Sequence, residues 1–217
     1  RSAAFGMSGD NYRRMKQLLR VPHGIIYFTG PTGSGKTTTL YSVLQYLSGR
    51  LVNIVTIEDP VERNLPKVNQ IQVNERAGLN FQTGLRSILR QDPDIIMIGE
   101  TRDPETAEIS ASAAITGHLV FSTLHTNDAA SSVTRLMDMG IPAYLAAASI
   151  AGIISQRLMR KVCPYCQEEY EARPEEVKIL YGRPADPGEH VRLRRGKGCY
   201  LCNETGYKGR IAIHEIL

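Results

Sequence analysis

Eight consecutive residues carry the pattern of a phosphate-binding loop. Residues 30–37, Gly-Pro-Thr-Gly-Ser-Gly-Lys-Thr, match G-x-x-x-x-G-K-[ST] at every fixed position. The glycines let the backbone curl until successive N–H groups point at phosphate oxygens, and a helix beginning near Gly35 adds the positive end of its dipole. Lys36 can then reach the β- and γ-phosphates, and the Thr37 hydroxyl can ligate Mg²⁺. The predicted phosphate-binding residues are Gly30, Pro31, Thr32, Gly33, Ser34, Gly35, Lys36, Thr37 and Thr38.

Two acidic segments lie where strands are predicted to end. Residues 94–100, Asp-Ile-Ile-Met-Ile-Gly-Glu, form an apolar run that ends in a carboxylate, with Gly99 where a Walker B motif usually has aspartate. Glu100 must then act alone from this strand: it holds Mg²⁺ through water, activates the attacking water, or does both. Glu58 ends the preceding strand and would meet the same edge of a parallel sheet, as a general base or an indirect partner of the metal. The alternative is that Asp59-Pro60 only makes a turn.

Three further side chains are candidates for handling phosphate charge. His125 follows a predicted strand directly and is expected to sense or stabilise the γ-phosphate; the alternative is a hydrogen-bonded structural histidine. For His118 the two interpretations weigh about equally. Arg86 and Arg90 lie four residues apart on one predicted helix face, from which they would reach a phosphate or a neighbouring subunit. The alternative for this pair is a surface salt bridge.

The four cysteines form two C-x₂-C pairs, Cys163/Cys166 and Cys199/Cys202. This spacing predicts a tetrahedral Zn²⁺ site in a small loop-rich segment that lacks a large core of its own. Disulfides are the alternative, and a reducing cytosol disfavours them. Four thiolates leave no open coordination position, so we expect a structural metal without a catalytic role.

A parallel sheet with helices on both faces would bring these groups together. Buried strands are predicted at 24–30, 51–57, 94–98 and 119–123, and a half-exposed one at 68–73. Helices are predicted within 1–23 and at 33–49, 81–90, 104–115, 127–139 and 142–159, with 139–154 as a buried helical run. A strand therefore precedes the glycine-rich loop and a helix follows it, which disfavours a ligand-free turn. The pattern predicts an α/β, RecA-like P-loop NTPase core with a mostly parallel sheet and a small tetracysteine zinc-binding module.

Composition sets the limits on domain organisation. The 217 residues are 42% hydrophobic and 22% charged, which is typical of a globular chain and excludes a fully disordered one. After residue 160 the apolar runs disappear. We predict a core at 1–160, the tetracysteine module at 161–210, and the start of a further, truncated C-terminal segment at 211–217. The sequence contains no run of 18 apolar residues and no signal peptide, and we expect the chain to be a fragment.

The net charge of +4 permits acidic partners without requiring nucleic acid, and aromatic residues, at 6%, offer few stacking platforms. The basic run at 192–197, Arg-Leu-Arg-Arg-Gly-Lys, nevertheless keeps one alternative open. That alternative is a RecA-like, nucleic-acid-dependent ATPase with a zinc ribbon. A small-molecule kinase is less consistent with the four cysteines. Gly99 also allows a scaffold that binds nucleotide without hydrolysing it.

Five segments together resemble the secretion ATPases of type II secretion and type IV pilus assembly. They are GPTGSGKTTTLY, TIEDPVE, GLRSILRQDPDIIMIGETRDPETAEI, TGHLVFSTLHTNDA and QRLMRKVCPYC. The resemblance, to the GspE/PilB branch of the VirB11-like superfamily, runs from about residue 7 to the C-terminus. It implies a Walker A motif at 30–37, an Asp box at 57–62, an atypical Walker B motif at 94–100 in which Gly99 is expected, and a His box at 116–125. The tetracysteine motif separates this branch from the retraction ATPases and the VirB11 proteins.

The resemblance implies an ATPase that uses ATP, Mg²⁺ and Zn²⁺ and powers protein secretion or pilus assembly. Its expected partners are further copies of itself in a homo-hexamer and an inner-membrane platform protein, with no nucleic acid. It is expected to be cytoplasmic, with peripheral association at the inner membrane through these partners. Members carry N-terminal domains that supply arginines in trans, so this C-terminal ATPase fragment is expected to hydrolyse ATP weakly by itself.

Overall fold

A computed structural model describes residues 5–7, 9–184, 186 and 188–217. It divides the chain into two compact units. The first comprises the chain up to Leu158 together with Ala212–Leu217, and the second comprises Met159–Ile211. The sequence predicts divisions after residues 160 and 210 and a further segment at 211–217, whereas in the structure Ala212–Leu217 belong to the first unit.

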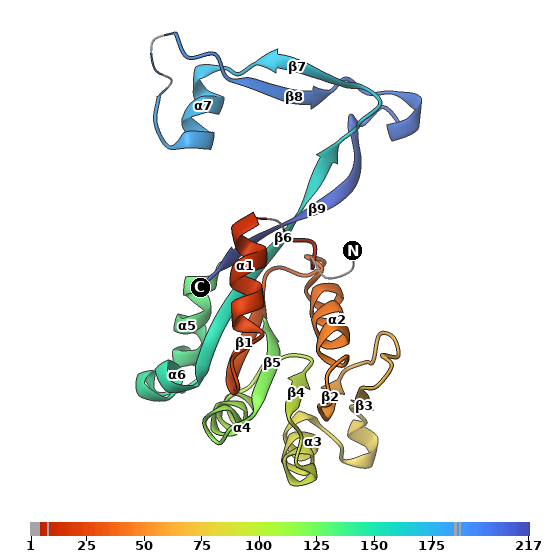
Figure 1. Cartoon of the computed structure of the whole chain (residues 1–217), viewed down its shortest axis with the longest axis vertical. Coiled ribbons are helices and arrows are strands. Elements are labelled where there is room, and N and C mark those ends of the chain that lie inside the picture. The colour runs from red at the N-terminus through yellow and green to blue at the C-terminus, as the bar shows by residue number, and fades with distance from the viewer. Residues whose placement is uncertain (1–4, 8, 185, 187) are drawn as a thin grey trace. The chain divides into compact units, whose positions relative to one another are not determined.

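The first unit is organised around a mostly parallel sheet with strand order β3-β2-β4-β5-β1-β6-β9 (Figure 1). Neighbouring strands from β3 to β6 all pair in parallel. Ile153 and Leu217 exchange two backbone hydrogen bonds of 3.0 Å, the antiparallel pattern, where β6 meets the end of β9. This confirms the predicted α/β class. The strands are β1 Gly24–Thr29, β2 Ile54–Glu58, β3 Asn69–Gln72, β4 Ile95–Ile98, β5 Leu119–Leu124, β6 Ile150–Val162 and β9 Tyr207–Ile216.

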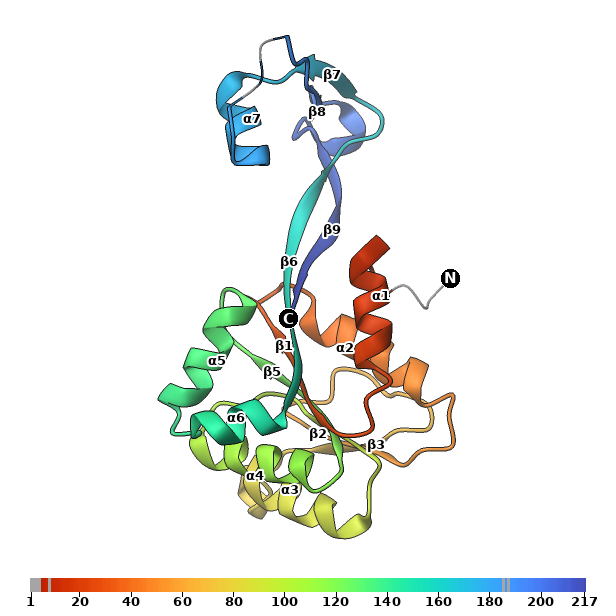
Figure 2. The ribbon, with the colours of Figure 1, turned by 60° about the vertical axis from the view of Figure 1, so that its left-hand side comes forward.

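Alternate strand residues feed two apolar cores, one on each face of the sheet. Ile26 and Phe28 of β1 pack in the core under α1 and α2, whereas Ile25 and Tyr27 pack in the core under α3 to α6. Figure 2 shows these two groups of helices on opposite sides of the strands. The helices are α1 Gly9–Leu18, α2 Lys36–Leu47, α3 Phe81–Ile88, α4 Pro104–Ile115, α5 Ala129–Asp138 and α6 Ala143–Ser149, with 3₁₀ turns at Glu75–Ala77 and Leu89–Gln91.

The helix predicted at 142–159 is wrong in its second half. Helix α6 ends at Ser149, and β6 begins at Ile150 and pairs in parallel with β1. An apolar run looks alike in sequence whether it forms a buried helix or a strand covered on both faces. Here Ile153 packs in one core and Ile154 in the other, as a central strand requires. Within the buried helical run predicted at 139–154, only Ala143–Ser149 are helical.

The second unit contains a two-stranded antiparallel sheet and a short helix. The basic run at 192–197, which kept the nucleic-acid alternative open, lies on and directly after β8, opposite carboxylates of β7. Arg195 lies 2.8 Å and Lys197 2.7 Å from Glu168, and Arg194 lies 3.0 Å from Glu169, so carboxylates offset much of this positive charge. The elements are β7 Gln167–Glu171, α7 Pro174–Tyr181, β8 Arg192–Gly196 and a 3₁₀ turn at Tyr200–Cys202. In the described part of the chain no helix has both the length and the hydropathy needed to span a bilayer.

Candidate active site and metal centre

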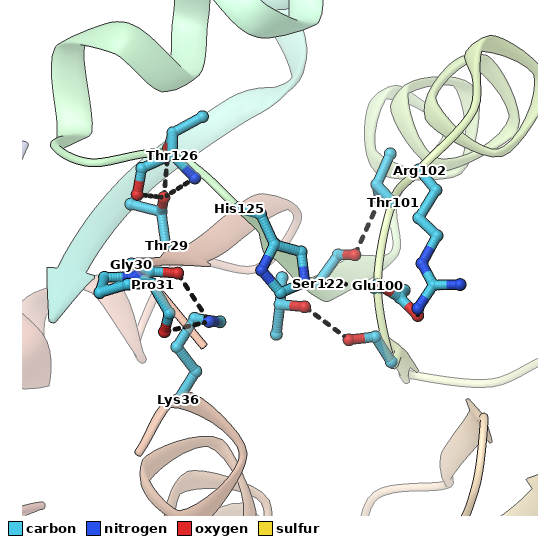
Figure 3. A network of polar contacts seen from close by, with 12 residues as sticks. Thr29, Gly30, Pro31, Lys36, Glu100, Thr101, Arg102, Ser122, His125 and Thr126 are labelled. Atoms are coloured by element: carbon cyan, nitrogen blue, oxygen red, sulfur yellow. Dashed lines mark hydrogen bonds and ion pairs between the residues drawn. The ribbon is translucent and has the colours of Figure 1, made fainter. Parts of the chain in front are cut away.

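The loop between β1 and α2 curls around the ammonium group of Lys36. Gly30, Gly33 and Gly35 have φ values of 140°, 77° and 83°, a region that glycine enters without steric cost. Lys36 donates from Nζ to the carbonyl oxygens of Gly30 at 2.7 Å and Pro31 at 3.1 Å (Figure 3). An ammonium group has three donors, so one remains for a ligand. No side chain caps the start of α2, which leaves its first N–H groups to an anion as well.

Two features of this loop fit an anionic ligand. Burial lowers the pKa of Lys36, and the nearby Glu100 carboxylate opposes that shift. A phosphate placed beside the ammonium would compensate the desolvation in the same way. Ser34 has a buried hydroxyl oxygen with no hydrogen-bond partner among the described residues. Such an orphaned group beside glycine N–H donors is consistent with a loop built to take phosphate oxygens.

A cleft of about 390 Å³ opens beside the loop, a volume suited to a small-molecule ligand. Its walls come from the loop and from the carboxyl ends of β2, β4 and β5, because parallel strands end at one sheet edge. Of the predicted loop residues, Thr32, Gly33, Lys36 and Thr37 line the cleft, whereas Thr38 is exposed on the first turn of α2. Other lining residues are Glu58, Glu100, Arg102 and His125.

Glu100 lies between Arg102 and His125 in the cleft (Figure 3). Arg102 places Nη2 2.5 Å from one of its carboxylate oxygens, and His125 places Nε2 3.5 Å from the other. The Glu100 side chain is only 11% exposed, so both contacts hold it at the cleft wall. A Cβ on Gly99 would touch Glu58 Cα and the Ile57 carbonyl oxygen at 3.4 Å. A side chain at position 99 would therefore lie directly against the β2 backbone.

Glu58 is held by three neutral donors rather than by a cation. Its carboxylate accepts from the Thr56 hydroxyl at 2.6 Å, from the Gln70 amide at 3.0 Å and from the Tyr41 hydroxyl. Burial and the Glu58 hydrogen bond raise the pKa of Tyr41 to about 12, so its hydroxyl keeps its proton. That hydroxyl also accepts from the Glu62 N–H at 3.2 Å. Tyr41 therefore ties α2 to the turn after β2.

Sequence reasoning missed the residues that fix Glu58. Tyr41 lies in the helix predicted at 33–49 and Gln70 in the half-exposed strand predicted at 68–73, and neither was singled out for chemistry. In the structure the Tyr41 ring is buried, and Gln70 is half-buried on β3. The additional hydrogen bonds depend on which atoms the folded sheet brings within reach, and no local pattern encodes that.

His125 lies on a turn that is tied to the phosphate-binding loop. Thr29, the last residue of β1, donates its hydroxyl to the Thr126 carbonyl at 3.0 Å and accepts from the Thr126 N–H at 3.2 Å. Thr123 donates to the Gly99 carbonyl at 2.7 Å, which joins β5 to the segment that carries Glu100. His118 instead precedes β5, at the far end of the strand from the cleft, and its Nδ1 lies 3.0 Å from the Ala113 carbonyl oxygen.

The structure does not bring Arg86 and Arg90 into this cleft. They line a separate hollow between α3 and α4, where Arg86 lies 3.0 Å from Glu105. Arg90 donates to the Ser87 hydroxyl at 3.1 Å and forms no ion pair within the described ranges. The arginine that reaches the cleft is Arg102, which sequence reasoning did not single out. The one feature of the sequence that could have identified Arg102 is its position two residues after Glu100.

The four cysteines of the second unit gather into one cluster, and their sulfur atoms all lie within 4.8 Å of one another. Three of the distances are 4.0 Å for Cys163–Cys199, 3.9 Å for Cys166–Cys202 and 3.7 Å for Cys199–Cys202. Tetrahedral Zn²⁺ with bonds of about 2.3 Å requires sulfur atoms about 3.8 Å apart, whereas a disulfide requires about 2.05 Å. Cys202 also accepts from the N–H groups of Cys199 and Gly206, at 3.2 and 3.3 Å. The donor set therefore fits zinc, and all four thiols are free.

Comparison with known proteins reveals extensive similarity. The model of a family described as "Type II/IV secretion system protein" matches residues 2–217. The type II secretion system ATPase E of Vibrio cholerae is 50% identical over 99% of this chain and 42% of its own length. The type IV pilus assembly ATPase PilB of Thermus thermophilus is 50% identical over 98% of this chain and 24% of its own length.

A crystal structure of the pilus retraction motor PilT with bound ADP has the same core fold. The TM-score is 0.64 at 41% identity, over 72% of this chain and 48% of that chain. This similarity confirms the predicted P-loop ATPase fold. The chain spans less than half the length of these relatives.

Proposed function

Because this chain belongs to the type II/IV secretion system protein family, we propose that it is the ATP-hydrolysing motor part of a protein-secretion or pilus-assembly machine. One observation carries the proposal: the Lys36 ammonium and the Glu100 carboxylate line a single cleft beside the phosphate-binding loop. A phosphate-binding group and a water-activating group are the two parts that nucleotide hydrolysis requires.

Each side chain of the cleft has a distinct task in this proposal. The loop N–H groups and the free donor of Lys36 bind the β- and γ-phosphate oxygens. Thr37 would hold Mg²⁺, which neutralises phosphate charge when bound. Glu100 orients the attacking water and accepts its proton, while Arg102 and His125 hold the carboxylate in place. Glu58 acts indirectly, because its oxygens are already engaged by neutral donors.

The complete protein is proposed to work as a homo-hexameric ring on the cytoplasmic side of the inner membrane. There it would dock on a membrane platform protein and convert ATP hydrolysis into secretion or fibre assembly. Arg86 and Arg90 are candidates for contact with a neighbouring copy, since both are exposed outside their own cleft. Zn²⁺ would stabilise the second unit. A nucleic-acid motor is less consistent with the offset charges of β8.

Two substitutions separate binding from chemistry. Lys36→Ala should abolish binding of a non-hydrolysable Mg·ATP analogue, measured by calorimetry. Glu100→Gln should keep binding and lose turnover, measured as phosphate release by the full-length protein. Glu175→Gln, at an exposed glutamate on α7 that lines neither the cleft nor the hollow of Arg86 and Arg90, is the matched control and should leave both unchanged. Unchanged turnover in Glu100→Gln would remove Glu100 from the proposed role, and absence of analogue binding by the wild-type chain would overturn the proposal.

A further inference from the structure

We propose that Gln156 is a positioning residue of the phosphate-binding loop and that His214 fixes the orientation of its amide. The inference rests on the proposed function, because it concerns the same cleft. It adds two residues, 58 positions apart, that were assigned no role in phosphate or metal binding.

Gln156 is buried beside the loop. In the parallel register of β1 and β6, Thr29 lies opposite Ser155, so Gln156 lies beside the first loop residue, Gly30. A Cβ on Gly30 would lie 2.2 Å from the Gln156 carbonyl oxygen, and one on Gly35 would lie 2.9 Å from its side-chain nitrogen. Only glycine at these two positions lets β6 and the loop approach so closely.

The Gln156 amide binds one peptide group of the loop. Its Nε2 donates to the carbonyl oxygen of Ser34 at 2.8 Å. In a trans peptide the carbonyl of one residue and the N–H of the next point in opposite directions. Binding the Ser34 carbonyl therefore turns the Gly35 N–H away from Gln156. The loop presents its N–H groups to phosphate. Fixing this peptide therefore orients the Gly35 N–H group before the phosphate binds.

His214 determines which way the Gln156 amide points. The Ser34 carbonyl can only accept, so Nε2 of Gln156 must face it and Oε1 must face the other way. There Oε1 lies 3.2 Å from Nε2 of His214, on β9. An amide oxygen accepts only, so this ring nitrogen must carry the hydrogen. Burial lowers the pKa of His214, and the neutral ring with its proton on Nε2 satisfies the contact.

Neighbouring residues of the same two strands bind the connection between β5 and α5. Arg157 donates to the Asn127 carbonyl at 3.0 Å, and Glu215 accepts from the Ala129 N–H at 3.1 Å. Both contacts fix the segment that follows His125. Strands β6 and β9 thus anchor the phosphate-binding loop through Gln156 and the His125 turn through Arg157 and Glu215.

The test measures nucleotide affinity and folding separately. Gln156→Met keeps the length of the side chain and removes both polar atoms, so the Ser34 peptide loses its donor. We expect affinity for a non-hydrolysable Mg·ATP analogue to fall by about tenfold, the upper range for loss of one hydrogen bond. Ser149→Ala is the control, because it removes a buried hydroxyl that bonds to Leu145 in α6 and should leave affinity unchanged.

Two substitutions at His214 form the second part of the test. His214→Leu removes the donor to Gln156 and should weaken affinity severalfold, whereas His214→Gln keeps an N–H donor and should bind nearly as the wild type does. Thermal unfolding of each variant identifies any that fails to fold. If Gln156→Met does not fold, the comparison of His214→Leu with His214→Gln tests the inference instead. Wild-type affinity in a folded Gln156→Met chain, or equal affinities in the two His214 variants, would overturn the inference. Absence of binding by the wild-type chain would instead overturn the proposed function.

Discussion

The Tyr41 hydroxyl is the link between the helix after the phosphate-binding loop and the buried Glu58 carboxylate. It donates to Glu58 and accepts from the Glu62 N–H at 3.2 Å. Tyr41→Phe removes this oxygen and leaves the ring, on which the Arg63 guanidinium stacks at 5.5 Å. The substitution therefore tests the hydroxyl alone. We expect it to destabilise the first unit and to leave one Glu58 oxygen without its donor.

The expected loss of unfolding free energy in Tyr41→Phe depends on which hydrogen bonds to Glu58 remain. Thr56 and Gln70 still donate to one oxygen, while the other oxygen loses its donor inside a site where Glu58 is 3% exposed. A hydrogen bond to a charged group contributes about 1.5–3 kcal/mol. Glu62 is exposed, so its N–H can turn to water. We therefore expect a loss of about 2 kcal/mol in unfolding free energy, or about 4–8 °C in Tm for a chain of this size.

Urea unfolding followed by far-UV circular dichroism, with thermal melting in parallel, measures this loss. Tyr46→Phe is the matched control on the same helix, because Tyr46 is partly exposed and its hydroxyl has no hydrogen-bond partner among the described residues. The control should change the unfolding free energy by less than about 0.5 kcal/mol. If the two variants unfold alike, the hydroxyl does not hold Glu58 and the reasoning is wrong.

Two further predictions concern the metal and pH. Chelation of Zn²⁺ should unfold Met159–Ile211 before the first unit, because within the described chain both apolar cores are built from first-unit residues and metal binding supplies the missing folding energy. Protease cleavage confined to that unit would show this, with Cys166→Ser as a metal-free comparison; simultaneous unfolding, or no zinc by elemental analysis, would contradict it. The raised pKa of Tyr41, about 12, means that its contribution to stability is fully present below pH 10 and is lost as the pH rises through 12. Absorbance at 295 nm should show a late-ionising tyrosine that Tyr41→Phe lacks, and an unchanged titration would refute the assignment.

The sequence alone determined the features that depend on residues close together in the chain. The loop at 30–37 and the two cysteine pairs are recognisable because neighbouring residues build each half of the site. The apolar runs predicted most of the sheet, since a strand covered on both faces must be apolar throughout. Strand ends, and with them Glu58 and Glu100, followed from these runs.

Tertiary structure decided whatever depends on register and on partners far apart in sequence. Only pairing with β1 distinguishes β6 from a buried helix, because the apolar pattern is the same for both. Arg102 reaches Glu100, whereas Arg86 meets Glu105, although local sequence offers all these charges alike. The hydrogen bonds from Gln156 to the Ser34 carbonyl and from His214 to Gln156 form only once the sheet is assembled. Local pattern fixes which residues must be buried, but the atoms that meet are set by how the strands align.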